Sequence, residues 1–355
     1  MQDNIDDVVI GETVISGFSS ETGEIFLSGK SLEKISHHMK LEDCIELLWS
    51  NFFSKSMFED NLQIALGHAR EQIFHYTEQI DDALLEMSPL EAVRALISRI
   101  PDDNDFTTAL HMVAAPAVFA PAFLRMKRGR HVIRPDSSIS HSVDILRMMN
   151  VSMPEPREVQ ALDTFLISIA DFGLTPATFA ARIAASERLS ITSSIIVALS
   201  VLSEEKHDSN PTAALNILDI LSSGKTNDDW MAEAGDKYAA LCEPRRRDVR
   251  ADIIKSTLVS LENNSGLKVA SKLALVDALD DKIIDSHNRS KSNGGFLSRN
   301  KLYCALLLEQ LGFPSEFFSC VIAMGRTVGW VAHCREQMRN SWLIRPTLRY
   351  IGPEE

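Results

Sequence analysis

The stretch GRTVGWVAHCREQ at residues 325–337 decides the fold of this chain, together with LIRPTLRYIGP at residues 343–353. The first motif lies within residues 315–340, where apolar residues recur at helical spacing. In that helix Arg326 and His333 are seven residues apart and therefore share one face. The second motif belongs to a proline-containing arm that we expect to be extended.

Each of the two motifs contains an arginine, Arg326 in the first and Arg345 in the second. A guanidinium stays charged, and its planar fork binds a carboxylate through two parallel hydrogen bonds. For either arginine alone, a surface salt bridge is the simpler interpretation. We expect His333 to fill a hydrogen-bonding niche in the core.

The rest of the chain predicts an all-α fold with a small N-terminal β-hairpin. The only good strand pattern is at residues 13–16 and 24–27, which flank a turn rich in Ser, Thr and Gly. Pro116 and Pro121 interrupt an alanine-rich helix that ends in basic residues, with Gly129 as its cap. Helical periodicity recurs over residues 41–49, 60–76, 89–99, 158–203, 212–223, 226–262, 301–312 and 315–340.

Length and composition indicate a globular protein of about two domains, at roughly 150 residues each. The chain has 355 residues, of which 45% are apolar and 24% charged. Its 36 basic and 49 acidic residues give a net charge of −13, which argues against nucleic acid or an anionic membrane surface as a partner. We also find no apolar run near the ~20 residues of a membrane helix, the longest being around residues 195–202.

Neither the N-terminus nor the cysteines suggest secretion. Residues 1–9 are acidic, the reverse of the start of a signal peptide. The five cysteines are scattered, odd in number and without a CxxC pair, so neither a disulfide framework nor a zinc site is indicated. We therefore expect a reducing, cytoplasmic location.

The two C-terminal motifs resemble the end of the citrate synthase family. There, a helix reading Arg-Thr-x-Gly-Trp-x-Ala-His precedes an arm reading Ile-x-Arg-Pro-x-x-x-Tyr-x-Gly. The resemblance extends over nearly the whole chain, through LLW at 47–49, RG at 128–129 before Pro135, ADFG at 170–173, ATFAAR at 177–182 and DVRA at 248–251.

The resemblance implies a helical homodimer with two domains, a large one of residues 1–207 plus 307–355 and a small one of residues 208–306. It implies that oxaloacetate, or a similar small anionic 2-oxo acid, binds in the cleft between them. An acyl-CoA then binds as co-substrate, and neither a metal nor a tightly bound cofactor is expected.

The family's carboxylate-binding arginines are kept. Arg250 matches the arginine of the family's Asp-Pro-Arg-Ala segment. Arg326 matches the arginine that opens the tryptophan-bearing helix. Arg345 matches the Arg-Pro arginine that reaches into the neighbouring subunit. The resemblance therefore makes all three substrate-binding candidates.

His207 matches the family histidine that steadies the enol of the acyl group. Its surroundings, EKHDS at 205–209, lack the glycines that normally flank it. The alternative is that His207 is an ordinary polar loop residue.

Three other family positions are changed. The histidine that binds oxaloacetate is replaced by Phe172, which makes Phe172 a substrate-site residue. Counting back from Arg250 without a gap puts Leu241 at the second catalytic histidine. Tyr303 fixes the register of a third segment, in which the aspartate that acts as the base is replaced by Lys301.

Lys301 alters the charge of the predicted site. A lysine is normally protonated at neutral pH and replaces a carboxylate base only if its pKa is strongly depressed. Either ordinary citrate synthase chemistry has been lost, or the pocket has changed its ligand. In the second case Lys301 would hold a further anionic group, such as a third carboxylate or a phosphonate.

Arg245 and Arg247 belong to a run of three arginines that could bind the phosphates of CoA. An exposed charge run is the alternative interpretation.

Two functions remain open from the sequence. The first is an acyltransferase that condenses an acyl-CoA with a 2-oxo acid related to oxaloacetate. In it Arg250, Arg326 and Arg345 hold the acid and His207 polarises a carbonyl. The second is an inactive homologue that binds or senses a di- or tricarboxylate.

Overall fold

The computed structural model describes most of the chain outside the predicted small domain. The described residues are 9–19, 22–59, 61–150, 152–204, 242–243, 248–262, 272–274, 276–277, 296–297, 299–340 and 342–352. The predicted helix over 212–223 and most of the one over 226–262 lie outside them. The division into large and small domains therefore stays a prediction.

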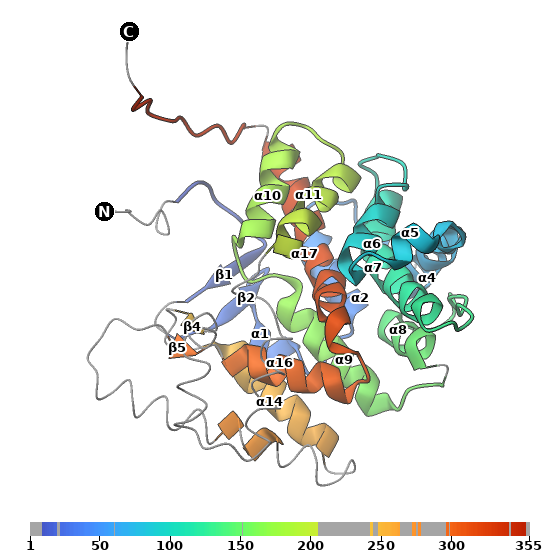
Figure 1. The fold of residues 1–355 in the computed structure, drawn as a ribbon. Coiled ribbons are helices and arrows are strands. Elements are labelled where there is room, and N and C mark those ends of the chain that lie inside the picture. Colours follow the sequence, from blue (N-terminus) through green and yellow to red (C-terminus); the bar gives the residue numbers. More distant parts are fainter. Residues whose placement is uncertain are drawn as a thin grey trace.

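The described part is mostly helical, as predicted (Figure 1). Two short 3₁₀ helices, Phe74–Gln79 and Ser315–Phe317, accompany the α-helices. The α-helices are α1 (Leu32–Ile35), α2 (Leu41–Trp49), α3 (Ser56–Glu59), α4 (Leu62–Ile73), α5 (Asp82–Leu85), α6 (Pro89–Ile97), α7 (Phe106–Lys127), α8 (His141–Asn150), α9 (Pro156–Ala170), α10 (Pro176–Ser186), α11 (Ile191–Glu204), α14 (Val249–Glu262), α16 (Arg299–Gln310) and α17 (Phe318–Asn340).

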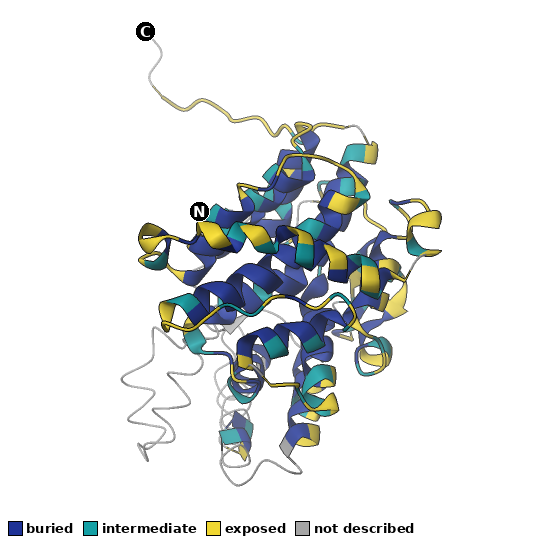
Figure 2. Ribbon diagram, turned by 90° about the vertical axis from the view of Figure 1, so that its right-hand side faces the viewer, coloured by how far each residue is buried: buried dark blue, intermediate teal, exposed yellow. Residues whose placement is uncertain are grey.

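Helix α17, which carries the first motif, is the centre of the core. It packs against α7, α9, α10 and α11. Figure 2 shows that buried residues predominate inside the helical body, whereas exposed residues lie on its outside. Almost every residue from Phe318 to Gln337 is buried, including Arg326 and His333. Because its polar side chains have no access to water, each must find a partner inside the protein.

The N-terminal strands form a three-stranded antiparallel sheet of β1 (Ser16–Phe18), β2 (Ile25–Leu27) and β3 (Lys30–Ser31). In its register Ser16 pairs with Leu27, so the predicted hairpin is present. The first strand starts later than the predicted residues 13–16. The preceding backbone is bound elsewhere: Val14 N–H donates to Glu336 Oε1 of α17 at 3.0 Å. Two further short strands, β4 (Cys242–Glu243) and β5 (Phe296–Leu297), pair with each other.

One prediction about the helices was wrong. Pro116 and Pro121 lie inside an uninterrupted α7, where tight packing on all sides supports the helix despite the missing backbone donors. The stretch over 158–203 is helical, as predicted, and consists of three helices separated at Gly173 and Arg188, whose φ angles are +101° and +64°. The cap at Gly129 was predicted correctly, with φ of +65°.

Within the described residues, two helices are long and apolar enough to span a membrane. They are α7 and the stretch Ser315–Asn340, which contains α17. The expectation that no such run exists was therefore wrong. In both, 89% of the most apolar window is buried inside the protein, so these helices form the core of the fold.

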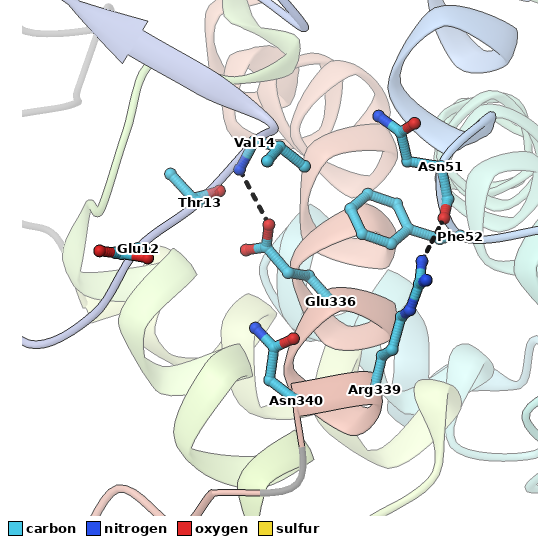
Figure 3. Close-up of a pocket in the computed structure, with 8 residues that line it drawn as sticks. All are labelled: Glu12, Thr13, Val14, Asn51, Phe52, Glu336, Arg339 and Asn340. Carbon is cyan, nitrogen blue, oxygen red and sulfur yellow. Dashed lines mark hydrogen bonds between the residues drawn. The ribbon is translucent and has the colours of Figure 1, made fainter.

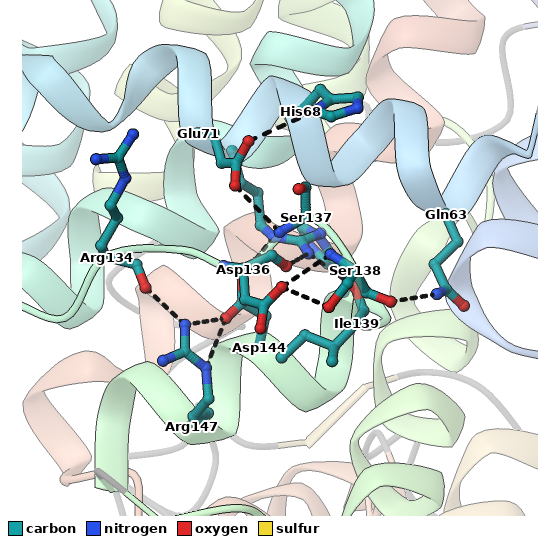
Figure 4. Close-up of polar contacts among 12 residues, drawn as sticks. Gln63, His68, Glu71, Arg134, Asp136, Ser137, Ser138, Ile139, Asp144 and Arg147 are labelled. Atoms are coloured by element: carbon teal, nitrogen blue, oxygen red, sulfur yellow. Dashed lines mark hydrogen bonds and ion pairs between the residues drawn. The ribbon is translucent and has the colours of Figure 1, made fainter.

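A buried arginine organises the loop between α7 and α8 (Figure 4). Arg70 of α4 is fully buried and donates through Nε to Asp144 Oδ2 of α8 at 2.8 Å. Its Nη2 donates to the backbone oxygens of Asp136 and Ile139 at 3.1 and 3.0 Å. Arg147 donates to the same carboxylate, so one aspartate joins two arginines and the loop.

We predict that Gly329→Ala destabilises the protein, because α17 approaches the end of α9 too closely for a side chain. A Cβ at this position would lie 2.2 Å from Ala170 O and 2.7 Å from Asp171 Oδ2. Such overpacking costs about 1–3 kcal/mol, which outweighs the gain in helix propensity of about 1 kcal/mol. Thermal and denaturant unfolding measure the loss.

The control is Gly17→Ala in strand β1, where nothing lies within 4 Å of the added Cβ. Its effect should stay within about 0.5 kcal/mol. Equal stability of the Gly329 and Gly17 variants would contradict the close-packing argument.

Candidate functional site

Arg326 lies in the middle of α17 and is only 3% exposed. Its Nη2 donates to the hydroxyls of Thr175 at 2.9 Å and Thr178 at 2.5 Å, both at the start of α10. Its Nη1 donates to Ile169 O at 3.4 Å. Thr175 also caps α10, because its hydroxyl accepts from Thr178 N, and Pro176 follows at the first helical position. The guanidinium is thus fixed by a helix N-terminus.

Arg250 lies in the first turn of α14 and is 4% exposed. Its Nε donates to Asp248 Oδ1 at 2.9 Å, and its Nη2 donates to Asp248 Oδ2 at 2.6 Å. The same carboxylate accepts from the backbone N–H of Arg250 at 3.0 Å. Asp248 therefore caps α14 and orients the Arg250 guanidinium at the same time.

Phe172 brings these two arginines together. The Cζ atom of Arg250 lies 4.0 Å from the centroid of the Phe172 ring, and that of Arg326 lies 4.3 Å from it. These distances are those of cation–π contacts. Arg250, Arg326 and Phe172 therefore lie together in the fold, and their predicted role in binding the substrate stays a prediction. The position predicted to replace a histidine is occupied by a ring that contacts both guanidiniums.

Asp171, next to Phe172, is fully buried and has several charged or polar partners. Its Oδ2 accepts from His333 Nε2 at 3.0 Å, and its Oδ1 accepts from the Ser16 hydroxyl of β1. Burial alone would raise the pKa of Asp171. The contacts with His333, the charge of Arg326 and the bond from Ser16 outweigh burial and lower that pKa to about 2.

His333 continues this chain of contacts through α17. Arg182 Nη1 lies 2.9 Å from His333 Nδ1 and donates to Glu336 Oε2 at 2.5 Å. This agrees with the expectation that His333 fills a core niche.

Lys301 lies in the first turn of α16 and is 7% exposed. Cys304, three residues later, is on the same side of the helix. Burial raises the pKa of Cys304 to about 12. Helix α16 packs against α14, the helix that carries Arg250. Tyr303, which set the register, donates to Asp277 at 2.8 Å.

Arg345 is not brought to the other arginines within this chain. Its side chain is 65% exposed and forms an ion pair with Glu187, with Nε 3.1 Å from Oε1. The arm that carries it leaves the body of the molecule (Figure 1). His207, Leu241, Arg245 and Arg247 lie outside the described residues, so their predicted roles stay predictions.

A surface hollow of about 690 Å³ lies elsewhere, beside the last turns of α17 (Figure 3). Glu12, Asn51, Glu336 and Arg339 are among its lining residues. None of the predicted site residues lines it. It is therefore separate from the arginine cluster, although Glu336 also belongs to the chain of contacts through Arg182.

Four residues that contact the predicted site residues had no predicted role: Thr175, Thr178, Asp248 and Asp171. A Thr-Pro pair before a helical stretch is a signature of a helix start, so a cap at Thr175 was detectable. Its second role, as acceptor for an arginine far away in sequence, had no local signature.

We predict that Asp171 makes the protein sensitive to acid between pH 4 and 2. Because the pKa of Asp171 is lowered to about 2 in the folded state, its stabilisation is present above about pH 4 and is lost as the pH falls through 2. Asp171→Asn should lower stability at pH 7 by about 2 kcal/mol. It should also flatten the dependence of unfolding free energy on pH in this window.

Denaturant unfolding at several pH values measures both effects. Glu46→Gln, which alters an exposed carboxylate on α2, is the control and should change little at pH 7. An unchanged acid slope in Asp171→Asn would contradict the prediction.

Comparison with known proteins agrees with this architecture. Residues 4–347 match the family model described as "Citrate synthase, C-terminal domain". The citrate synthase of Haloferax volcanii is 25% identical, in an alignment that covers 99% of this chain and 96% of that protein. The 2-methylcitrate synthase of Mycobacterium tuberculosis is 23% identical, covering 98% and 90%.

Solved structures match along the whole chain. Citrate synthase from Thermotoga maritima superposes with a TM-score of 0.81 at 23% identity, covering 100% of this chain and 97% of that one. Citrate synthase from Thermoplasma acidophilum, solved as a ternary complex with carboxymethyl coenzyme A and oxaloacetate, gives a TM-score of 0.81 at 20% identity, covering 100% of this chain and 98% of that one. These structures support the fold. Because the family model covers nearly the whole chain, this protein belongs to the citrate synthase family.

Proposed function

We propose that this protein is a transferase that joins an acyl-CoA to a small anionic 2-oxo acid related to oxaloacetate. The observation that carries the proposal is the pair of buried guanidiniums, Arg250 and Arg326, held over one aromatic ring. Two buried guanidiniums side by side, one of them paired with Asp248, favour an anionic ligand. Relatives named citrate synthase and 2-methylcitrate synthase supply the reaction class.

Lys301 enlarges the positive region in this proposal. It stands where the family has an aspartate, so the local charge changes from −1 to +1 beside the Arg250 pair. An acid with a third charged group, or a phosphonate in place of a carboxylate, would use this extra charge. His207 polarises a carbonyl, and Arg245 and Arg247 meet the phosphates of CoA.

The second candidate function is a carboxylate-binding protein without catalysis. Three changes favour it: Phe172, Leu241 and Lys301 replace groups that the family uses for binding and proton transfer. General acid and base groups typically contribute 10²–10⁴-fold each to a rate, so their loss matters. Both candidates require an acid to bind at the arginines, and they differ in whether a thiol is released from acyl-CoA.

We also propose a homodimer in which Arg345 enters the site of a second copy. The arm carries apolar side chains exposed to water, with Leu348 100%, Ile351 91% and Tyr350 71% exposed. A stretch of this kind indicates a surface that another chain covers. The exposed ion pair with Glu187 is weak enough to be exchanged for an intersubunit contact.

For the dimer, we predict that sedimentation equilibrium at micromolar concentration gives twice the chain mass of 39.5 kDa. Removing residues 343–355 should weaken the dimer, because the exposed apolar side chains are lost. Leu189→Ser, which removes one exposed apolar side chain from the loop before α11, is a control for hydrophobicity alone. A full-length chain that sediments as a monomer would refute the arrangement.

For function, we predict that this protein binds both oxaloacetate and a tricarboxylate such as tricarballylate. We also predict that, with acetyl-CoA and oxaloacetate as substrates, it releases thiol much more slowly than an ordinary citrate synthase does. Lys301→Asp should shift preference towards oxaloacetate by at least about tenfold, equivalent to 1.4 kcal/mol. Calorimetry and a thiol-release assay measure the two quantities.

Lys30→Asp makes the same charge change on the exposed strand β3 and serves as the control. Acid binding without thiol release from any acyl-CoA tested would favour the second candidate. Rapid release with acetyl-CoA, at tens per second, would contradict the argument from the three replaced residues. No acid binding at all would exclude both candidates.

A further inference from the structure

We propose that Phe172 is a positioning residue. Its ring contacts both Arg250 and Arg326 and holds them in the orientation in which both bind one dianionic acid. Both Cζ atoms lie within 4.3 Å of one ring centroid. The two Cζ atoms therefore lie no more than about 8 Å from each other. The inference rests on the proposed function, and it adds how the site is assembled.

The ring has a physical reason to be there. Two guanidiniums in a dry interior repel each other, and the repulsion grows as water is excluded. Arg250 and Arg326 are 4% and 3% exposed, so little water screens them. A cation–π contact is stronger when desolvated than at the surface. A phenyl ring can therefore attract both cations without adding a charge.

Both guanidiniums are also held by their N–H groups, which point within the plane of the group. Asp248 fixes one edge of Arg250, and Thr175 and Thr178 fix one side of Arg326. With a ring contact and an edge constrained, each guanidinium has little rotational freedom left to lose when an acid binds.

The backbone around Phe172 is rigid enough for this role. Asp171 is fully buried and bound to Ser16 and His333. Gly173 has φ of +101°, and its N–H donates back to Asp171 Oδ1 at 3.0 Å. Phe172 is thus held between a buried carboxylate and a glycine turn that few other residues adopt.

The ring also limits what the site can recognise. A phenyl group neither donates nor accepts a hydrogen bond, so contacts to an acid near it come from the charged guanidiniums. We therefore expect the contribution of Phe172 to be the same for a dicarboxylate and a tricarboxylate.

The test compares Phe172→Leu with Phe172→Tyr, in the full chain, by calorimetry with oxaloacetate and tricarballylate. Leu fills part of the volume without a π-face, whereas Tyr keeps the ring. We expect Phe172→Leu to bind both acids at least about fivefold more weakly, and Phe172→Tyr to stay within about twofold of the wild type. Phe172→Met is measured in parallel and should behave like Phe172→Leu.

A matched control exists in the same chain. Arg335 lies over the ring of Phe53, with its Cζ 4.8 Å from the centroid, in a cluster of core aromatics. Phe53→Leu removes a ring–arginine contact away from the site, so it should lower the melting temperature but leave acid binding unchanged.

Three results would overturn the inference while leaving the proposed function intact: wild-type affinity in Phe172→Leu, an equal loss in Phe172→Tyr, or the same loss in Phe53→Leu. A wild-type protein that binds neither acid would instead remove the proposed function, and this inference with it.

Discussion

The close approach of α17 to the end of α9 is the constraint on which the rest of the site depends. Gly329 allows it, since a Cβ there would collide with the backbone of Ala170. The approach places Arg326 on one side of this crossing and His333 on the other, so that Thr175 and Asp171 become their partners. Gly329 therefore determines how close the guanidinium of Arg326 and the carboxylate of Asp171 lie to Phe172.

The interior around this crossing contains a chain of hydrogen-bonded polar and charged side chains. Asp171, His333, Arg182 and Glu336 follow one another, and Glu336 ends on the backbone of Val14. An unpaired buried charge is costly, whereas a paired and hydrogen-bonded one is tolerated. The same logic applies to Arg70 and Asp144, which hold the loop before α8. In both places polar groups give an exact geometry to segments that have little secondary structure of their own.

The sequence predicted the helical class, the central helix and the grouping of Arg250, Arg326 and Phe172, because these depend on periodicity and on motifs that resemble a known family. It did not predict Asp248 or Thr178 as partners, since those contacts depend on how helices pack. The start of β1 was misplaced because Val14 is bound by a residue of the last helix. Pro116 and Pro121 were expected to break a helix that tertiary packing keeps continuous. Arg345 shows a different limit: its predicted role needs a second chain.

The bond between Val14 and Glu336 also constrains how the protein is made. These residues are 322 positions apart, and Trp49 donates to Val328 O across 279 positions. A chain emerging from the ribosome presents its N-terminal sheet first and its central helix last. During most of synthesis the early helices lack the element that they surround, so their apolar faces are exposed. Contacts of such long range close large loops and form slowly. The nascent chain is therefore expected to depend on chaperones until its last helix has been released.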